Sequence, residues 1–390
     1  MGKSGGWLQG IQYFRAIAAI EVIVIHATSY GYSLPPFQKD LIIACVALTS
    51  FAVPHFIFIS GVVLYNKYSE GFSLSTLSTF YKKRFSSVLP PYLVWSTFYY
   101  SYPFVIVTLF SALFRRPSLL FGSNVGFNLG GFVTALATGI GQLWFLLLLM
   151  QLYLLYPFLV KLYNRFSRQK HTIYVLLLVF LAQLVFNLLF VPLDSHNIFF
   201  LSCFFYFVLG FFVAEQYGTI IQRLTSVRLS SMSIVVVLST ICYASIFIYN
   251  SSYWVSADSR FLVPLQYVWF YQVTGPLYCA LLIAFYLRLG TDWGEPHGFF
   301  TRSLDKIGEE SFGIYLTHLF FIVLFTASLT TAGLGYNNLL FYPTLVLLTL
   351  ISSYWSVRGL YRLPFSTIVL GKPRKKESEL PQTERIPSAQ

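Results

Sequence analysis

The sequence is poor in charged residues. Only 10% of its 390 residues are Asp, Glu, Lys or Arg, while 56% are hydrophobic. A soluble globular protein carries roughly 25% charged residues, and the few charges here cannot cover the surface of a soluble protein of this size. Lipid must therefore be the solvent for much of the chain, and we expect a polytopic membrane protein.

Cysteine is also scarce. The four cysteines all lie in apolar stretches, and the chain has no C-x-x-C motif and no Cys/His cluster. This pattern argues against a disulfide framework or a metal site and indicates four inert core thiols. P-loop and dinucleotide-binding fingerprints are missing as well. We therefore expect neither a bound metal nor a permanently bound cofactor.

Long apolar runs, in contrast, are abundant. A bilayer-spanning helix needs roughly 20 mostly apolar residues. The runs show no strand-like alternation, which excludes a membrane barrel and predicts an all-α bundle of transmembrane helices. Ten spans are expected, at residues 9–30, 41–66, 88–114, 131–160, 172–192, 198–216, 231–250, 264–289, 311–332 and 338–361. The fourth run is over-long and is expected to include an interfacial segment before Gly141.

Basic residues alternate between the loops. With the N-terminus inside, 21 Lys and Arg residues fall on the cytoplasmic side and four on the outer side. This asymmetry predicts that both termini are cytoplasmic, and it explains the net charge of +12 without a nucleic-acid partner. Residues 1–370 are expected to form the membrane domain. Residues 371–390 read as a disordered basic tail attracted to the lipid bilayer.

The first run carries three ionisable groups, Arg15, Glu21 and His26. Charges inside a span are costly, so each is a functional hypothesis. Arg15 and His26 are offset by eleven positions, which places both on one helix face, within about 20° and roughly 16 Å apart along the axis. We expect this stripe to line a cavity open to the cytoplasm. Glu21 points away by roughly 140° and is expected to pair with a basic group or to stay protonated.

The second run contains Pro54, which is expected to bend the helix, and Gly61, which permits close helix approach. His55 follows the proline directly. Carbonyls freed at the bend are expected to accept its proton, although a role beside His26 is an alternative.

Three consecutive cations, Lys82, Lys83 and Arg84, precede the third run, and Pro90 and Pro91 are expected to lie at a helix start. These cations have two compatible interpretations. One is a signal that orients the chain in the membrane, and the other is a site that binds the phosphates of a cytoplasmic ligand.

The ninth run is expected to place Glu309 and Glu310 in its first helical turn, where acids favour the helix dipole. Tyr315 and His318 are three residues apart and share a face, so both are expected to address one cavity.

Taken in order, these segments resemble the membrane-bound acyltransferase type three family of bacterial surface-glycan O-acyltransferases. The matching motifs are Arg15 to His26, F-I-F-I-S-G at 56–61 (which includes Ser60), the basic stretch at 82–92, W-F-L-L-L-L-M-Q-L-Y-L-L-Y-P-F-L from Trp144, and S-F-G-I-Y-L-T-H at 311–318. They run through most of the chain. One departure is Ser87, where many members carry a second Arg three residues after the first.

The resemblance implies a multi-pass protein of the bacterial cytoplasmic membrane that takes an acetyl or succinyl group from cytoplasmic acyl-CoA. The acyl-CoA is a donor substrate, and the acceptor is a hydroxyl on an exported polysaccharide or a lipid-linked glycan. Polysaccharide synthesis machinery is an expected partner. No fused outer hydrolase-like domain is expected, so the bundle presents the acceptor itself or passes the acyl group to a separate protein. A transporter of a polysaccharide or lipid-linked glycan is the alternative function.

The resemblance also assigns roles to residues. His26 is the expected general base or acyl carrier, with Arg15 beside it in the site. Arg15, Lys82, Lys83 and Arg84 are expected to bind the donor. The secondary candidates are Glu21, His55, Ser60, Glu310, Tyr315 and His318.

Overall fold

The computed structural model describes residues 5–28, 34–114, 128–168, 171–190, 198–256 and 265–372. Within these ranges the chain forms helices and no strands, which confirms the expected all-α class. The α-helices are α1 (Gly5–Ala27), α2 (Pro36–Thr49), α3 (Ala52–Tyr68), α4 (Leu74–Phe114), α5 (Leu129–Thr138), α6 (Trp144–Arg168), α7 (Thr172–Phe190), α8 (Phe204–Glu215), α9 (Tyr217–Ser226), α10 (Leu229–Ser256), α11 (Leu265–Trp293), α12 (Phe299–Thr331), α13 (Phe341–Leu360) and α14 (Ser366–Leu370). Two short 3-10 turns, η2 (Gly141–Leu143) and η4 (Phe200–Cys203), precede α6 and α8.

Seven helical stretches in the described part are long and apolar enough to cross a bilayer, or eight if the bent α8–α9 pair counts as one span. This confirms a polytopic membrane protein. The expected count of ten spans and the cytoplasmic position of both termini stay predictions. Most of the predicted basic tail, residues 373–390, lies outside the described residues.

The expected second span is two helices, and the break is not at Pro54. Helix α2 ends at Thr49, where the hydroxyls of Thr49 and Ser50 donate to carbonyls one turn back at 2.8 and 2.6 Å. Helix α3 then begins at Ala52, which places Pro54 in its first turn. A proline is tolerated there because the first-turn N–H groups have no partner within the helix. The prediction of a bend at Pro54 was therefore wrong by three to four residues.

Helix α4 begins well before the expected third span. Ser73 and Thr76 bond reciprocally, each side chain accepting the other's backbone N–H at 2.8 and 3.2 Å, and this capping box starts the helix. Pro90 and Pro91 therefore lie inside α4 and not at a helix start, contrary to the prediction. The three cations at 82–84 belong to the same helix and not to a loop.

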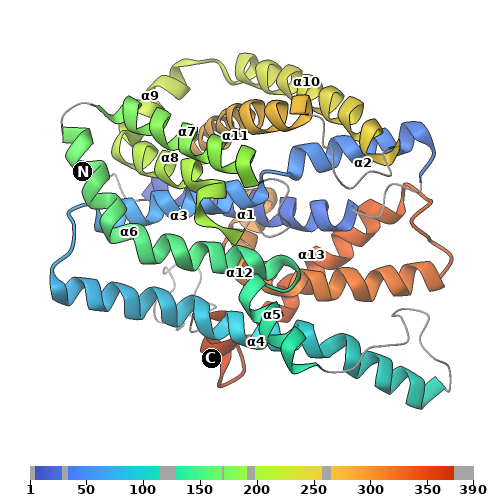
Figure 1. The fold of residues 1–390 in the computed structure, drawn as a ribbon. Coiled ribbons are helices and arrows are strands. Elements are labelled where there is room, and N and C mark those ends of the chain that lie inside the picture. The colour runs from blue at the N-terminus through green and yellow to red at the C-terminus, as the bar shows by residue number, and fades with distance from the viewer. Residues whose placement is uncertain are drawn as a thin grey trace, which may run out of the picture.

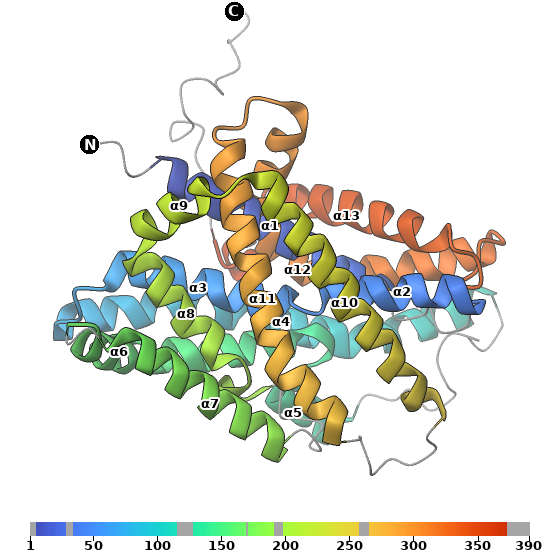
Figure 2. The ribbon, with the colours of Figure 1, turned by 90° about the horizontal axis from the view of Figure 1, so that it is seen from above.

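Helix α1 lies in the middle of the bundle, packed against α3, α11, α12 and α13 (Figures 1 and 2). Glycines allow this close packing. A Cβ on Gly308 of α12 would lie 2.2 Å from the carbonyl oxygen of Gln12, and one on Gly290 of α11 would lie 2.7 Å from Cα of Gly10. The charged groups of α1 are therefore surrounded by other helices.

The predicted close approach at Gly61 is confirmed. A Cβ on Gly61 would lie 2.2 Å from the carbonyl oxygen of Phe207 on α8, and one on Gly210 would lie 2.5 Å from that of Phe58. Small residues of this kind let transmembrane helices pack backbone to backbone. Helices α3 and α8 therefore pack backbone to backbone at this point.

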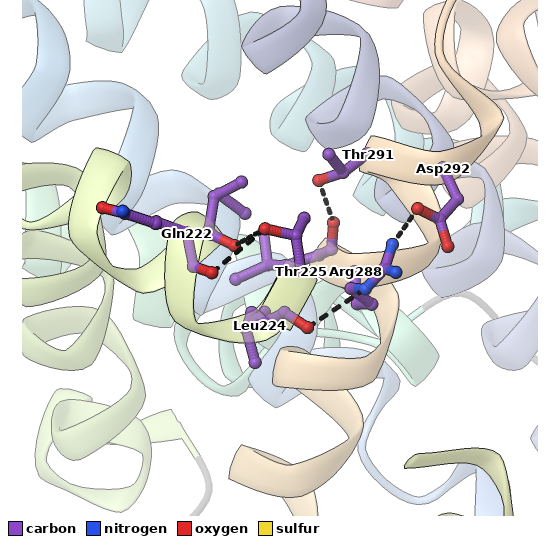
Figure 3. A network of polar contacts seen from close by, with 8 residues as sticks. Gln222, Leu224, Thr225, Arg288, Thr291 and Asp292 are labelled. Atoms are coloured by element: carbon purple, nitrogen blue, oxygen red, sulfur yellow. Dashed lines mark hydrogen bonds and ion pairs between the residues drawn. The ribbon is translucent and has the colours of Figure 1, made fainter. Parts of the chain in front are cut away.

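Polar contacts from α11 hold the C-terminal part of α9, a helix that is bent by 86° relative to α8. Arg288 of α11 donates from Nε to the carbonyl oxygen of Leu224 at 3.1 Å and forms an ion pair with Asp292 one turn on (Figure 3). Helix α9 has no buried residue, but its half-buried Ile220 and Ile221 pack against the core. The polar contacts of Arg288 therefore add to an apolar contact with the bundle.

The expected segment before Gly141 is present as the separate helix α5. Gly139 and Gly141 have φ of 78° and 54°, a conformation that favours glycine. Tyr92 of α4 donates its hydroxyl to the carbonyl of Leu136 at 2.5 Å. Helix α5 and the start of α6 are thereby fixed against α4.

Candidate active site

Arg15 and His26, at the two ends of the stripe on α1, both face neighbouring helices of the bundle. The Arg15 guanidinium lies within electrostatic reach of Arg84 on α4 and Tyr153 on α6, and it donates to Oε1 of Gln12 at 3.3 Å. The His26 ring lies 5.3 Å, centroid to centroid, from that of His318 on α12. Both side chains are half-buried. One helix therefore links a cationic cluster at one end to a pair of imidazoles at the other.

The cationic cluster is held by aromatic rings. The Arg84 guanidinium lies 5.7 Å from the ring centroid of Tyr68 and 5.8 Å from that of Tyr153. Its Nε is buried and has no hydrogen-bond partner among the described residues. The Ser60 hydroxyl of α3 lies near the Tyr153 hydroxyl. The result is two guanidinium groups close together, with hydroxyl and aromatic neighbours.

The three predicted cations of α4 differ in their placement. Arg84 is half-buried and lies within electrostatic reach of Arg15, whereas Lys82 and Lys83 are exposed. Helix geometry explains this, because successive residues are rotated by about 100° and cannot all face one neighbour. The structure therefore brings Arg15, Arg84 and Ser60 to one common neighbour, Tyr153, and it leaves the two lysines exposed on α4.

A shallow pocket adjoins the cluster. It has a volume of about 200 Å³ and is lined by Tyr68, Ser75, Thr76, Thr79 and Phe80. Tyr68 also carries the Arg84 guanidinium on its ring. Tyr68 therefore belongs both to the lining of the pocket and to the cationic cluster.

The hydrogen bonding of His318 defines the tautomer of its imidazole ring. Nδ1 of His318 lies 2.7 Å from the carbonyl oxygen of Tyr315. A carbonyl only accepts, so Nδ1 carries the proton and Nε2 bears the lone pair. This Nε2 is buried without a hydrogen-bond partner in the described part of the chain. The site thus holds a second imidazole nitrogen able to accept a proton, beside His26.

Tyr315 was expected to address the same cavity as His318. Their ring centroids are 6.0 Å apart, but the Tyr315 hydroxyl donates to the carbonyl oxygen of Gln142. Tyr315 therefore joins α12 to η2 and holds the backbone that positions His318. The side-chain amide of Gln142, 2% exposed, has neither its nitrogen nor its oxygen paired within the described ranges.

Glu21 and His55 form a separate buried pair. His55 Nδ1 donates to Oε2 of Glu21 at 2.7 Å, and the Tyr286 hydroxyl donates to Oε1 at 3.1 Å. The expected pairing of Glu21 with a basic group is confirmed. The expected bond from His55 to a freed carbonyl was wrong, since the helix break lies before His55 and its proton goes to Glu21. Phe14 and Tyr286 pack against the His55 ring.

Glu310 lies well inside a helix. Helix α12 begins at Phe299, about three turns earlier, so the expected position of Glu309 and Glu310 in a first turn was wrong. Glu310 is 7% exposed, and its Oε2 lies 3.5 Å from Nζ of Lys372. Gly371 and Lys372, which were expected to belong to a disordered tail, are therefore placed against the bundle.

Sequence reasoning missed Tyr153 and Lys372. Tyr153 lies in the aromatic segment that follows Trp144, where one Tyr among many apolar residues gives no signal of its own. Lys372 lies in a basic stretch that reads as a topology signal. Within the described ranges, no three His, Cys, Asp or Glu side chains cluster closely enough to hold a metal ion.

Comparison with known proteins identifies the family. The family model described as an acyltransferase domain matches residues 8–358, nearly the whole described bundle. No curated protein and no solved structure matches the chain. The matched range includes Arg15, Arg84, His26 and His318.

Proposed function

We propose that this chain, which belongs to the acyltransferase family, transfers an acyl group, most simply acetyl, from cytoplasmic acyl-CoA to a hydroxyl of an exported or cell-surface polysaccharide. The alternative acyl group is succinyl, and the alternative acceptor is a lipid-linked glycan. We place the reaction in the bacterial cytoplasmic membrane. One observation carries the proposal: α1 joins the Arg15–Arg84 cluster to the His26–His318 pair.

The cationic cluster supports an anionic donor. Two guanidinium groups repel each other, and Arg84 Nε is buried without a partner in the described structure. A bound phosphate would remove the repulsion with its negative charge and would pair the Nε with one of its oxygens, whose geometry suits the guanidinium group. The pocket beside Tyr68 has room and aromatic surface for a nucleotide base. We therefore place the phosphates of CoA at Arg15 and Arg84, with the base beside Tyr68.

The imidazole pair supports the transfer step. From Arg15 to His26 the helix rises roughly 16 Å, a distance that an extended pantetheine arm bridges. The acceptor hydroxyl oxygen attacks the thioester carbonyl carbon, a C–O bond forms and the C–S bond breaks. The hydroxyl proton passes to His26, which acts as general base, and then to the CoA thiolate. Nε2 of His318 supplies a second acceptor next to this proton.

The direct test uses purified protein in lipid nanodiscs with radiolabelled acetyl-CoA. We expect release of CoA thiol, and labelled ester on polysaccharide supplied as acceptor. An Arg15→Ala/Arg84→Ala double variant should lose donor binding, whereas Arg165→Ala, which removes an exposed charge of α6, should not. A protein that neither binds nor consumes acetyl-CoA would contradict the proposal and favour the transporter alternative. Acetyl label trapped on His26 would instead identify an acyl carrier.

A further inference from the structure

We infer that Lys372 is a third cation of the donor site and binds a phosphate of the CoA donor together with Arg15 and Arg84. This inference rests on the proposed function, since it names a further ligand of the same substrate. It concerns a residue that follows the matched range 8–358.

The segment that carries Lys372 is anchored to α4. Trp95 donates from Nε1 to the carbonyl oxygen of Val369 at 3.0 Å, and Leu370 is 1% exposed. Figure 1 shows this C-terminal segment, in red, beside α4. The position of Lys372 is therefore determined by packing and not by a free chain end.

Pro91 provides the place where the segment docks. It has no N–H, so the carbonyl of Ser87, four residues earlier, lacks its helical donor. Gly371 lies directly against this carbonyl, and a Cβ there would be 1.9 Å from the Ser87 oxygen. Gly371 also has φ of 70°, which favours glycine. Both features fix the chain one turn beyond Arg84 and direct the next residue, Lys372, toward the bundle.

The contacts of Lys372 place its ammonium against α12, beside Glu309 and Glu310. Nζ lies 3.5 Å from Oε2 of Glu310 and bonds the carbonyl oxygen of Glu309. It lies 5.7 Å from the ring centroid of Tyr361 and within electrostatic reach of Arg15. The side chain is 44% exposed, so a cytoplasmic ligand has access to it.

Counted together, the three cations Arg15, Arg84 and Lys372 outnumber the two acids near them by one. Arg15, Arg84 and Lys372 form one connected set of cations, and the acids facing Lys372 are Glu310 and, at longer range, Glu309. An excess of positive charge in a partly buried site is costly without an anion. An ammonium on a flexible stem binds phosphate as a point charge, complementing the planar guanidinium fork. An acyl donor that carries several phosphate charges supplies the negative charge that these three cations lack.

The test compares two donors, acetyl-CoA and S-acetylpantetheine, which keeps the thioester and pantetheine arm but has no phosphate. Lys372→Ala should raise the KM for acetyl-CoA roughly tenfold, as expected for loss of one charged hydrogen bond. It should leave both kcat and the KM for S-acetylpantetheine near wild type. Lys372→Arg should retain most of the affinity. Arg362→Ala removes an exposed charge in the nearby segment before α14 and serves as the matched control.

Two results would overturn the inference. An unchanged KM for acetyl-CoA in Lys372→Ala shows that Lys372 only neutralises Glu310. A KM raised equally for both donors shows a general structural effect, and thermal unfolding of the variant would display it. If wild-type protein does not use acetyl-CoA at all, the proposed function fails and this inference falls with it. If wild type is active and only the Lys372 comparison fails, the proposed function stands.

Discussion

The imidazole ring of His26 on α1 lies 5.3 Å from that of His318 on α12, with the ring planes inclined by 37°. Because His318 donates from Nδ1 to the carbonyl of Tyr315, its Nε2 is left as an acceptor. A pair of imidazoles inside a bundle is expensive in lipid. A catalytic role gives a reason for its presence, and the cationic cluster at the other end of the same α1 stripe gives the donor a place to bind.

Arg84 should contribute more to donor affinity than the two lysines beside it. Arg84→Ala is expected to weaken acetyl-CoA binding about tenfold or more, because it removes a charge-assisted contact. The loss should be larger at low salt, where charges are least screened. Lys82→Ala and Lys83→Ala should each have a smaller effect, since both side chains are exposed. Titration calorimetry at two ionic strengths measures this, and equal losses for all three variants would contradict the geometry.

The Glu21–His55 pair should act on stability and not on chemistry. Glu21→Ala leaves His55 and the Tyr286 hydroxyl without their acceptor, and breaking a buried pair costs about 3–5 kcal/mol. We expect a clear fall in the thermal unfolding temperature of the purified protein. The double variant with His55→Ala should be less destabilised than the sum of the two single variants. A folded Glu21→Ala protein without acyl transfer would show instead that the pair takes part in the reaction.

Gly61→Ala should disrupt the contact between α3 and α8. The added Cβ would meet the Phe207 carbonyl oxygen at 2.2 Å, so the helices must separate, at a cost of about 1–3 kcal/mol or more. Gly218→Ala in α9 is the matched control, because a Cβ there meets nothing within 4 Å and alanine favours a helix. Thermal unfolding of both variants is the measurement. Equal stability of the two would contradict the close packing.

His318 should affect turnover without affecting donor affinity. His318→Asn keeps a donor for the Tyr315 carbonyl and removes Nε2, so local structure is largely retained. We expect kcat to fall by about tenfold or more, while the KM for acetyl-CoA stays near wild type, because Arg15 and Arg84 are untouched. An unchanged kcat would show that His318 only fills space beside His26.

The parts of the structure that depend on one helix were predictable from sequence. Composition and long apolar runs indicated the helical bundle, and helix periodicity placed Arg15 and His26 on one face. The break between α2 and α3 was misplaced because Pro54 was taken as a helix breaker. In the first turn of α3 its missing N–H breaks no helical bond.

Contacts between distant elements were not predictable in the same way. Tyr153 reaches Arg15 only through the packing of α6, and Lys372 reaches Glu310 only because the segment after α13 folds back onto α4. Neither residue carries a local pattern. The same holds for His318, whose side chain was assigned to a cavity but whose neighbour His26 is visible only in three dimensions.

The central claim is that His26 is required for chemistry and not for folding. The measurement is polysaccharide O-acylation in cells that express wild type, His26→Ala or His26→Gln at matched protein levels, with thermal unfolding of each purified protein alongside. We predict near-wild-type stability and a loss of acyl transfer of about 100-fold or more in both variants, since a glutamine amide cannot take up a proton at neutral pH. Robust acylation by either variant would contradict the account and leave His26 as a packing residue.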